Sequence, residues 1–317
     1  MYRLPSLLMT LWCPLILAWA GPGTAAEKNV LVLLSKDQPE YQEVASSLRQ
    51  TLTQHAGQDI EVNVVTLADG VRRLTENTDT LPSMIVTVGT QAAKLTALQH
   101  ASTPILHTLL PRQAYLDLAR ERTQNRTRRH TAIYVDQPLR RQFNLVGFAL
   151  PEHTRVAVIL GPATASLENE LVTAARDRDL ALQVRHLSSP TELIPQLNEI
   201  LEESDALLSL PDPMVFNSNT LHHLLIATYH RKVPVVGFSR AFVEAGALLA
   251  VYSTPAQTGR QAAEIVRQAL QAPARPLPPP QYPRYFAVAV NRRVAASLGL
   301  DIPDEQTLLN RLQDRPE

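Results

Sequence analysis

The sequence predicts an α/β protein made of two similar lobes, each built around a parallel sheet. Short apolar runs alternate with helical stretches along the chain, and repeated strand–helix units require parallel strands joined by right-handed crossovers. A polar stretch around Asp136 divides the series into two sets. The 317 residues are about twice the usual length of one domain. A single barrel of eight strand–helix units is the alternative at this length.

The first set of units starts with the apolar run 30–34, which is typical of a strand buried on both faces of a parallel sheet. A helix is predicted over 39–55, because Val44, Leu48 and Leu52 are spaced by four residues. The same cycle then predicts strands over 62–67, 84–88 and 105–110, and helices over 91–99 and 112–121.

A polar loop at 122–130 closes the first set. It carries four arginines, Arg122, Arg126, Arg128 and Arg129. Because aromatic residues are few, a solvated surface loop is favoured over an anion-binding patch.

The second set of units follows residues 134–138. Its predicted strands are 156–160, 181–187, 206–210, 233–238 and 247–252, and its predicted helices are 166–178, 191–202, 218–230 and 255–271. The proline-rich stretch 272–280 is expected to be a semi-rigid connector, and this interruption counts against the barrel. A last strand over 285–290, a short helix from Arg292 and a helical tail complete the chain.

Composition excludes several classes of protein. Thirty basic and thirty acidic residues give a net charge of zero, so no nucleic-acid partner is expected. Hydrophobic residues make up 45% and charged residues 19%, as in a globular chain. The only cysteine, Cys13, disfavours a disulfide scaffold, a cysteine-ligated metal site and a cysteine enzyme.

Residues 1–26 have the features of a secretory signal peptide. Arg3 precedes an apolar run from Leu7 to Ala20, and small residues follow the helix-breaking Gly21–Gly23 segment. The apolar run is short for a membrane span, although a retained anchor helix is the alternative, and no later stretch is long enough to cross a membrane. We therefore expect an exported periplasmic protein that is mature from about Glu27 and does not span the membrane.

Polar residues at the carboxyl ends of the predicted strands are the candidate binding residues, because open parallel sheets bind ligands there. They are small hydroxyl, amide, carboxylate and tyrosine residues suited to a small polar solute: Ser35, Gly89, Thr90, Gln91, Thr108, Tyr134, Asp136, Asp212, Ser239 and Tyr252.

Two of these positions indicate which charged groups a ligand could carry. At Gly89 the backbone can approach a ligand closely, and Thr90 can cap a helix whose free N–H groups favour an anion. Simple capping without a ligand is the alternative. Asp212 can accept an ammonium group, or it can form the turn before Pro213.

Catalytic and cofactor motifs are missing from the sequence. It contains no G-x-S-x-G elbow, Walker loop, G-x-G-x-x-G fingerprint or H-E-x-x-H. His222 and His230 are about two helical turns apart, which is too far for one metal ion. We therefore expect no enzyme activity, no cofactor and no metal.

Several stretches after Asp205 resemble one protein family as a set. They are Asp205–Leu208 with Pro211–Asp212, Val233–Ser239, Gly246–Leu248, Tyr252–Ser253, Gly259–Ala263 and Tyr282–Leu300. Together they are similar to the ABC transporter substrate-binding proteins of the tryptophan and tyrosine importer type. The first half is similar in layout through Val88–Thr90 and the crossing at Asp136.

The resemblance implies a type I periplasmic-binding fold, in which two Rossmann-like parallel-sheet lobes are joined by three hinge crossings and hold a ligand between them. The crossings would lie near Asp136, near Ser253 and in the proline-rich connector. Lobe 1 would comprise 27–136 with 253–275, and lobe 2 would comprise 137–252 with 281–317; 276–280 would connect them.

The resemblance also assigns sides of the cleft. Ser35, Gly89, Thr90 and Gln91 would lie on the side of lobe 1, and Asp212, Asn217 and Ser239 on the side of lobe 2. Both tryptophans precede residue 20, so stacking against a ligand would fall to Tyr134, Phe216 or Tyr252.

Three functions follow as hypotheses. The first is a periplasmic receptor that closes around a small polar molecule, amino-acid-like or a carboxylate, and delivers it to an inner-membrane ABC permease. A zwitterion would place its anion at Thr90–Gln91 and its ammonium group at Asp212. The second is a sensor or interaction module of the cell envelope with a weak or absent ligand site. The third is an exported hydrolase, disfavoured because no nucleophile–base pair is visible.

Overall fold

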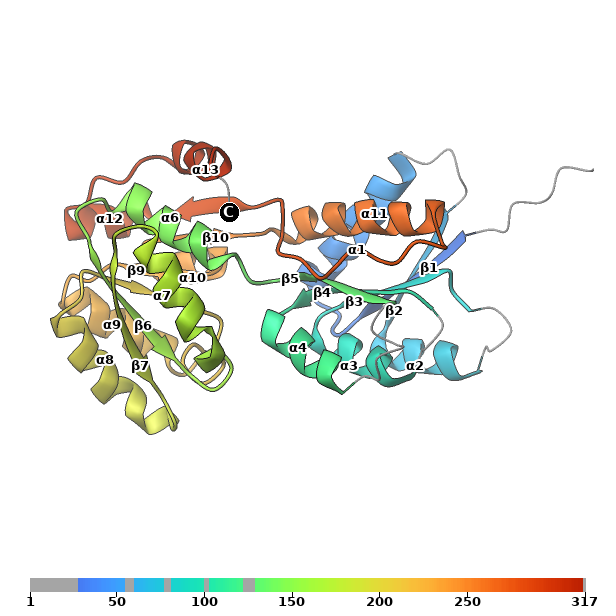
Figure 1. Ribbon diagram of the computed structural model, residues 1–317, viewed down its shortest axis with the longest axis horizontal. Helices are drawn as coiled ribbons and strands as arrows, with labels where there is room; N and C mark the ends of the chain where they lie inside the picture. The colour runs from blue at the N-terminus through green and yellow to red at the C-terminus, as the bar shows by residue number, and fades with distance from the viewer. Residues whose placement is uncertain (1–27, 55–59, 77–80, 100–102, 122–128, 316–317) are drawn as a thin grey trace, which may run out of the picture.

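Two sheets, each covered by helices on both faces, lie side by side along the long axis of the molecule (Figure 1). The computed structural model describes residues 28–54, 60–76, 81–99, 103–121 and 129–315. The expected signal peptide and Arg122, Arg126 and Arg128 of the polar loop lie outside these residues.

The first sheet is entirely parallel, with strand order β2-β1-β3-β4-β5. Every residue of β3 is buried, as expected of a strand covered on both faces. Helices α1 and α11 cover one face, and α2, α3 and α4 cover the other (Figure 1). The elements are β1 (Lys28–Leu34), α1 (Pro39–Gln54), β2 (Ile60–Thr66), α2 (Leu67–Glu76), β3 (Met84–Val88), α3 (Thr90–Gln99), β4 (Ile105–Leu110), α4 (Arg112–Arg120), β5 (His130–Tyr134) and α11 (Pro255–Gln271).

The second sheet has the order β11-β10-β9-β8-β6-β7, and only β11 is antiparallel to its neighbour among these strands. Helices α6, α7, α12 and α13 cover one face, and α8, α9 and α10 cover the other. The elements are α6 (Leu139–Ala149), β6 (Arg155–Leu160), α7 (Glu168–Arg176), β7 (Ala181–His186), α8 (Leu193–Glu202), β8 (Ala206–Leu208), α9 (Leu221–His230), β9 (Val235–Gly237), α10 (Arg240–Ala245), β10 (Leu249–Tyr252), β11 (Ala287–Val290), α12 (Arg292–Leu298) and α13 (Glu305–Gln313). Single 3-10 turns at Ala165–Leu167 and Pro190–Glu192 precede α7 and α8.

We call the first sheet with its helices the first lobe, and the second sheet with its helices the second lobe. The first lobe takes in α11, although this helix comes after β10 of the second sheet. Helix α11 packs so closely on α1 that a Cβ added at Gly259 would overlap the carbonyl oxygen of Val44. Ser47 of α1 also donates its Oγ–H to the carbonyl oxygen of Ala256 at 2.8 Å.

Residues at the start of α11 form a helix cap, which explains why the extended segment after β10 gives way to a helix. The Thr254 side chain accepts the N–H of Gln257, and the Gln257 side chain accepts the N–H of Thr254. This reciprocal capping box, followed by Pro255 at the first helical position, fixes the helix start.

The chain passes between the lobes three times. The first passage follows Tyr134, the second follows Tyr252, and the third lies between Gln281 and Ala287. We expected the third passage within the proline-rich connector, but Gln281 still pairs with β5, since its N–H donates to Ala132 and its carbonyl accepts from Tyr134. The proline-rich stretch therefore runs along the first lobe before the chain leaves it.

Most predicted elements are present within one to three residues, but the strand β5 and three helices were missed. Helix α6 is buried on most sides, including Arg141, Gln142 and Asn144, so it carries no clean polar face in the sequence. Helix α10 has only six residues, and α2 contains Gly70. Among the helices described, none has the length and apolar character needed to cross a membrane.

Candidate functional site

A cavity of 1020 Å³ lies between the two lobes, and we call it the interlobe cavity. Both lobes and the passages between them supply its wall. The first lobe contributes Thr90 and residues of α4 with the preceding Pro111, the second contributes residues of the loops after β6, β8 and β9, and the passages contribute Asp136, Gln137 and Tyr282.

The first-lobe wall depends on an irregular end of β4. The pairing of β4 with β5 shifts register between His107 and Leu110, and Leu109 has a φ of 48°. This irregularity precedes Pro111, after which α4 begins at Arg112. Arg112 and Gln113, in the first turn of α4, therefore line the cavity.

The second-lobe wall is built around Asp212. Its Oδ1 accepts the N–H of Met214 at 2.9 Å, and its Oδ2 accepts the hydroxyl of Thr164 at 2.9 Å. Gly161 leaves space for this carboxylate, since a Cβ there would overlap Asp212 Oδ1. Asp212 is 2% exposed, and it both forms the turn before Met214 and lines the cavity.

Two aromatic rings give the second-lobe wall an apolar patch. Phe216 and Phe238 line the cavity, and their ring centroids lie 5.9 Å apart in an edge-on arrangement. Phe242 is buried behind them, with its ring centroid 5.2 Å from that of Phe238. This cluster offers a face for the apolar part of a ligand.

Asp136 marks the first passage. Its Oδ2 accepts the main-chain N–H of Arg112 at 2.6 Å. Burial raises the pKa of the Asp136 carboxyl, and the hydrogen bond from Arg112 only partly offsets this effect. Neither Asp136 nor Asp212 makes an ion pair with a described residue. The group that donates to Asp136 is the neutral main-chain N–H of Arg112, although the charge of Arg112 also favours the ionised carboxyl.

A single arginine side chain connects the lobes across the cavity. Arg112 Nη1 lies 2.6 Å from Glu170 Oε2 of α7 and 3.0 Å from the hydroxyl of Tyr282. Burial opposes the charge of Arg112, but its bond to Glu170 and the attraction of Tyr282 and Glu170 outweigh burial and raise its pKa. Ser166 adds a second link, donating its hydroxyl to Gln113 Oε1 at 3.2 Å.

Five of the residues predicted from the sequence line the cavity: Thr90, Asp136, Asp212, Phe216 and Asn217. Asn217 also builds its own loop, where its Oδ1 accepts the N–H groups of Asn219 and Thr220. Thr90 is the first residue of α3, and the oxygen that accepts the Ala92 N–H belongs to Ser35, not to Thr90. The expected cap of this helix therefore comes from the residue that follows β1.

The other predicted residues lie outside the cavity wall. Gly89 has a φ of 90° and sits against Ser35, whose Oγ would be 2.7 Å from an added Cβ. Thr108 is fully buried and donates to the carbonyl oxygen of Thr87. Tyr134 packs edge-on against Tyr282, and burial raises its pKa to about 12.

Ser239 and Tyr252 hold local structure in the second lobe. The Ser239 hydroxyl accepts the N–H of Phe242 and so caps α10. The hydroxyl of Tyr252 accepts the Nε–H of Arg240 at 2.8 Å. Neither residue is in the cavity wall.

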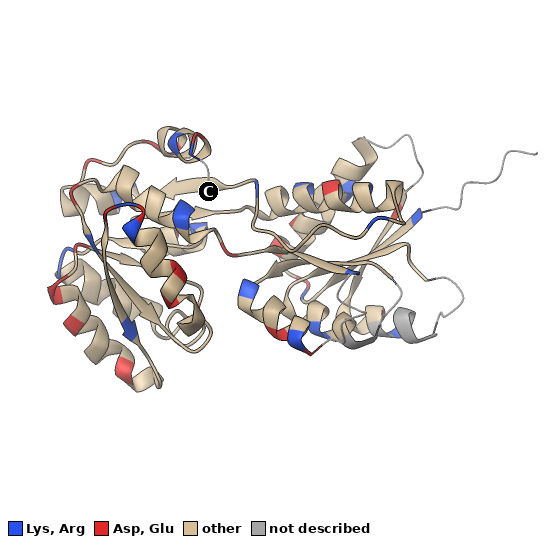
Figure 2. Ribbon diagram, viewed as in Figure 1, with Lys and Arg blue, Asp and Glu red and all other residues tan. Residues whose placement is uncertain are grey.

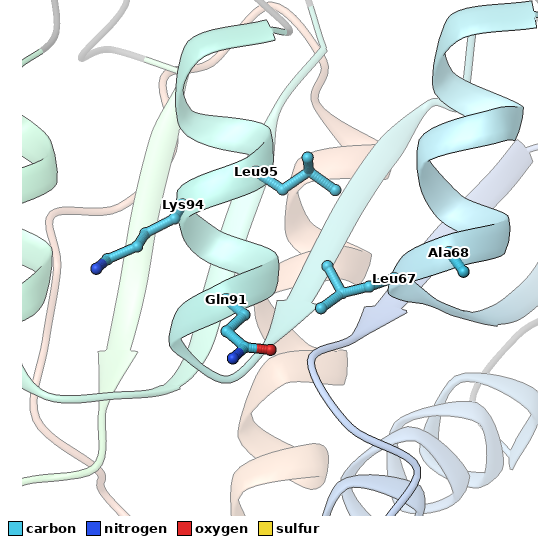
Figure 3. A pocket seen from close by; sticks show the side chains of 5 residues that line it. All are labelled: Leu67, Ala68, Gln91, Lys94 and Leu95. Atoms are coloured by element: carbon cyan, nitrogen blue, oxygen red, sulfur yellow. The ribbon is translucent and has the colours of Figure 1, made fainter.

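Gln91 lines a different hollow. This shallow depression of 570 Å³ lies between the starts of α2 and α3. Figure 3 shows Leu95 and Leu67 facing one another there, with the Gln91 amide beside Leu67 and the Lys94 side chain pointing away. Thr90 and Gln91, although adjacent, thus face two different places.

Sequence reasoning missed Arg112, Gln113, Glu170 and Tyr282. The strand 105–110 was predicted correctly, but its polar end was placed at Thr108, because the irregular turn at Leu109 leaves no sequence signature. A polar residue directly after Pro111 was the signal available. Nothing in the sequence indicates that Glu170, within a helix, reaches the other lobe.

Charged residues of both signs occur in each lobe. Figure 2 shows lysines and arginines interspersed with aspartates and glutamates over both lobes. Across the described ranges, no three histidine, cysteine, aspartate or glutamate side chains are grouped to hold a metal ion. His222, His223 and His230 lie on α9 and are exposed.

Comparison with known structures shows the fold. A conserved domain protein of Vibrio cholerae is 21% identical with a TM-score of 0.61, covering 90% of this chain and 98% of that one. A Streptococcus pneumonia ABC domain in complex with L-Trp is 15% identical with a TM-score of 0.62 over the same shares, 90% and 98%. The ligand-free, open structure of a Clostridium difficile substrate-binding protein with adhesive properties is 14% identical with a TM-score of 0.67, covering 88% and 97%.

The family follows from the sequence comparison. No curated protein matches the chain. The family model described as "ABC transporter substrate binding protein" matches residues 49–311. The expected family and fold are therefore confirmed: the chain belongs to the ABC transporter substrate-binding protein family and has a type I periplasmic-binding fold.

Proposed function

We propose that this protein is the solute-binding component of an ABC import system, which binds a small polar molecule in the interlobe cavity. It would work in the periplasm and deliver the ligand to an inner-membrane ABC permease. The observation that carries this proposal is the cavity of 1020 Å³ whose wall comes from both lobes, with three chain passages as the hinge. Closing the lobes would surround a ligand and select the bound form.

The charges of the wall favour a ligand that carries a cationic group. Asp136 and Asp212 have no cationic side chain as an ion-pair partner in the described part of the chain, whereas Glu170 pairs with Arg112 and Asp117 with Arg120. A carboxylate that accepts only neutral N–H and O–H groups retains capacity for an ammonium group. Asp212 is therefore the residue we assign to the ligand's amino group.

An anionic group of the same ligand would lie at the start of α3. Ser35 already accepts the N–H of Ala92, while the N–H groups of Thr90 and Gln91 make no hydrogen bond with any described residue. Thr90 belongs to the first lobe and Asp212 to the second, so an amino-acid-like zwitterion would be held from both sides. The phenyl rings of Phe216 and Phe238 would contact its apolar part.

A thermal-shift screen tests this proposal. The purified protein, and a sample unfolded and refolded to remove carried-over ligand, would be screened against amino acids, nucleosides, sugars and organic anions. Each amino acid would be paired with its N-acetyl derivative and its carboxamide. A receptor for a zwitterion is stabilised by the parent compound and less by either derivative. A blank across the whole screen would contradict the proposal and favour an envelope sensor or interaction module on the same fold.

Variants then test the residues with the compound that the screen identifies. Asp212→Asn keeps the size of the side chain and is expected to weaken binding of an ammonium ligand by roughly 2–5 kcal/mol if the pair is desolvated. Thr90→Ala should weaken binding less than Asp212→Asn does, since the backbone N–H groups at the start of α3 remain. Asp177→Asn serves as the matched control, because its carboxylate pairs with Arg140 outside the cavity wall. Unchanged affinity in folded Asp212→Asn would remove Asp212 from the site.

A further inference from the structure

The ion pair between Arg112 and Glu170 joins secondary-structure elements of different lobes. Arg112 is in the first turn of α4, and Glu170 is in the first turn of α7. The two side chains are 32% and 42% exposed, and their charged atoms are 2.6 Å apart. Among the described residues, one other ion pair includes residues of the cavity wall, and it lies within one helix, since Arg120 pairs with Asp117 three residues earlier on α4.

Both the main chain and the side chain of Arg112 make hydrogen bonds that hold the residue in place. Its main-chain N–H donates to Asp136 of the first passage, and its Nη1 also donates to Tyr282 of the third passage. The Tyr282 ring is itself fixed edge-on against Tyr134, at a centroid distance of 5.4 Å. A guanidinium already positioned by neighbours loses less conformational freedom on pairing than a free surface arginine does.

A neighbouring contact supports the same approach of the two helices. One residue after Arg112, Gln113 accepts a hydrogen bond from Ser166, which lies in the turn just before α7. Two polar contacts thus connect the start of α4 with the start of α7.

We propose that the Arg112–Glu170 pair is an interlobe clamp, which holds the lobes close together before a ligand arrives, and that Arg112 is a positioning residue for closure. This proposal deepens the function proposed above, because closure matters for a receptor. The clamp raises the fraction of molecules in the binding-competent form, and apparent affinity rises in proportion to that fraction. Loss of the clamp then lowers the affinity for every ligand by the same factor, and this factor is separate from the direct contacts that Glu170 can make as a residue of the cavity wall.

The clamp can be measured in the ligand-free protein. Nitroxide labels on Glu121→Cys and Asn169→Cys, two exposed positions beside the paired helices, report the distance between the lobes in a Cys13→Ser background. The pulsed electron–electron double resonance signal of the otherwise unchanged protein should show mainly the shorter distance. Glu170→Gln should lower the ratio of the short-distance population to the long-distance population by about two- to fivefold, which is the size of effect expected of a partly exposed ion pair.

Three comparisons separate a clamp from a general structural effect. Asp117→Asn removes an ion pair within α4 and should leave the distances unchanged. Glu170→Asp, which retains the charge, should restore part of the short-distance population. Raising the salt concentration should move the unsubstituted protein toward the longer distance but should have little effect on Glu170→Gln, whose clamp is already lost.

The result that would overturn the clamp is also defined. If Glu170→Gln gives the same distance distribution as the unsubstituted protein at low salt, or if Asp117→Asn gives an equal shift, the pair does not set the lobe positions. This readout needs no ligand. A blank ligand screen would therefore count against the proposed function and would leave the clamp result in place.

Discussion

Gln137 Nε2 donates to Ser253 Oγ at 3.0 Å, which ties the first passage between the lobes to the second. Ser253 in turn donates its hydroxyl to the carbonyl oxygen of Tyr285 at 2.7 Å, in the third passage. Arg141 completes the connection, because its Nη1 donates both to Gln137 Oε1 and to the carbonyl oxygen of Pro283. The three hinge segments are therefore linked by side chains as well as by the backbone.

Removing the Ser253 hydroxyl should destabilise this hinge. In Ser253→Ala, the buried Gln137 amide and the Tyr285 carbonyl each lose a partner, so the free energy of unfolding should fall by about 1–3 kcal/mol. Urea unfolding followed by circular dichroism measures the loss. Ser297→Ala is the matched control, since its hydroxyl donates to Val294 on an exposed helix surface and its loss should be nearly neutral. Equal effects of the two substitutions would contradict a special role for Ser253.

Gly161 should be intolerant of a methyl group because of Asp212. A Cβ would overlap the Asp212 carboxylate, so Gly161→Ala should push it away from Thr164 and lower the unfolding free energy by about 1–3 kcal/mol. Gly147→Ala provides the contrast. Gly147 lies within α6 with nothing within 4 Å of an added Cβ, so alanine should stabilise the helix by about 0.5–1 kcal/mol. Melting temperatures that move in the same direction for both variants would disprove this explanation.

The raised pKa of Asp136 gives the stability of the protein a pH dependence with a defined sign. The folded form binds its proton more tightly than the unfolded chain, where the carboxyl titrates near 3.8. The contribution of Asp136 to the unfolding free energy therefore decreases as pH rises from that value to the folded pKa, and is constant above it. Asp136→Asn abolishes this cost, so the variant should gain stability relative to the unsubstituted protein across the same window.

Asp304 provides a control of opposite sign for the same titration. Hydrogen bonds from the side chain and the N–H of Thr307 lower the pKa of Asp304, so this carboxylate stabilises the fold above its unfolded pKa and loses that effect as pH falls through its folded pKa. Asp304→Asn should therefore lose stability relative to the unsubstituted protein as pH rises. Urea unfolding between pH 3 and pH 7 compares the variants. Parallel curves for Asp136→Asn and the unsubstituted protein would argue against the buried-carboxyl explanation.

Gly259 should be required where α11 crosses α1. Alanine has the higher helix propensity, but its Cβ would overlap the Val44 carbonyl oxygen, which belongs to the backbone and moves only with α1. We expect Gly259→Ala to lower the unfolding free energy by about 1–3 kcal/mol. Hydrogen exchange should show the loss in α1 and α11 and not in α8 of the second lobe. Unchanged exchange in α1 would contradict the tight packing of this helix pair.

The sequence was sufficient for the fold wherever burial leaves a periodic or continuous apolar pattern. Strands such as β3 and β4, and the helix α11, were predicted with their observed bounds. Helix α6 was missed, because its polar residues Arg141 and Gln142 are buried. Arg141 donates to the carbonyl oxygen of Pro283 in the third passage, and Gln142 donates to that of Gln137. Tertiary contacts of that kind have no local signature.

The site was harder to predict than the fold. The rule that ligands bind at strand ends identified Thr90 and Asp212, which line the cavity, but it also selected Ser35 and Ser239, whose hydroxyls cap helices. A hydroxyl at a helix start has the same sequence context in both roles. The distinction depends on which way the helix faces, and only the packing of the lobes determines that.

The position of α11 has a consequence for synthesis on the ribosome. The strands of the first sheet leave the ribosome early. The core on one face of that sheet, which includes Val44 and Leu48 of α1, is completed by Ala262 and Val266 of α11, which are made only after most of the second lobe. A nascent chain that ends after β5 therefore exposes this apolar face to solvent and to chaperones. The first lobe is the earlier to begin folding, and it depends on one of the later helices to finish.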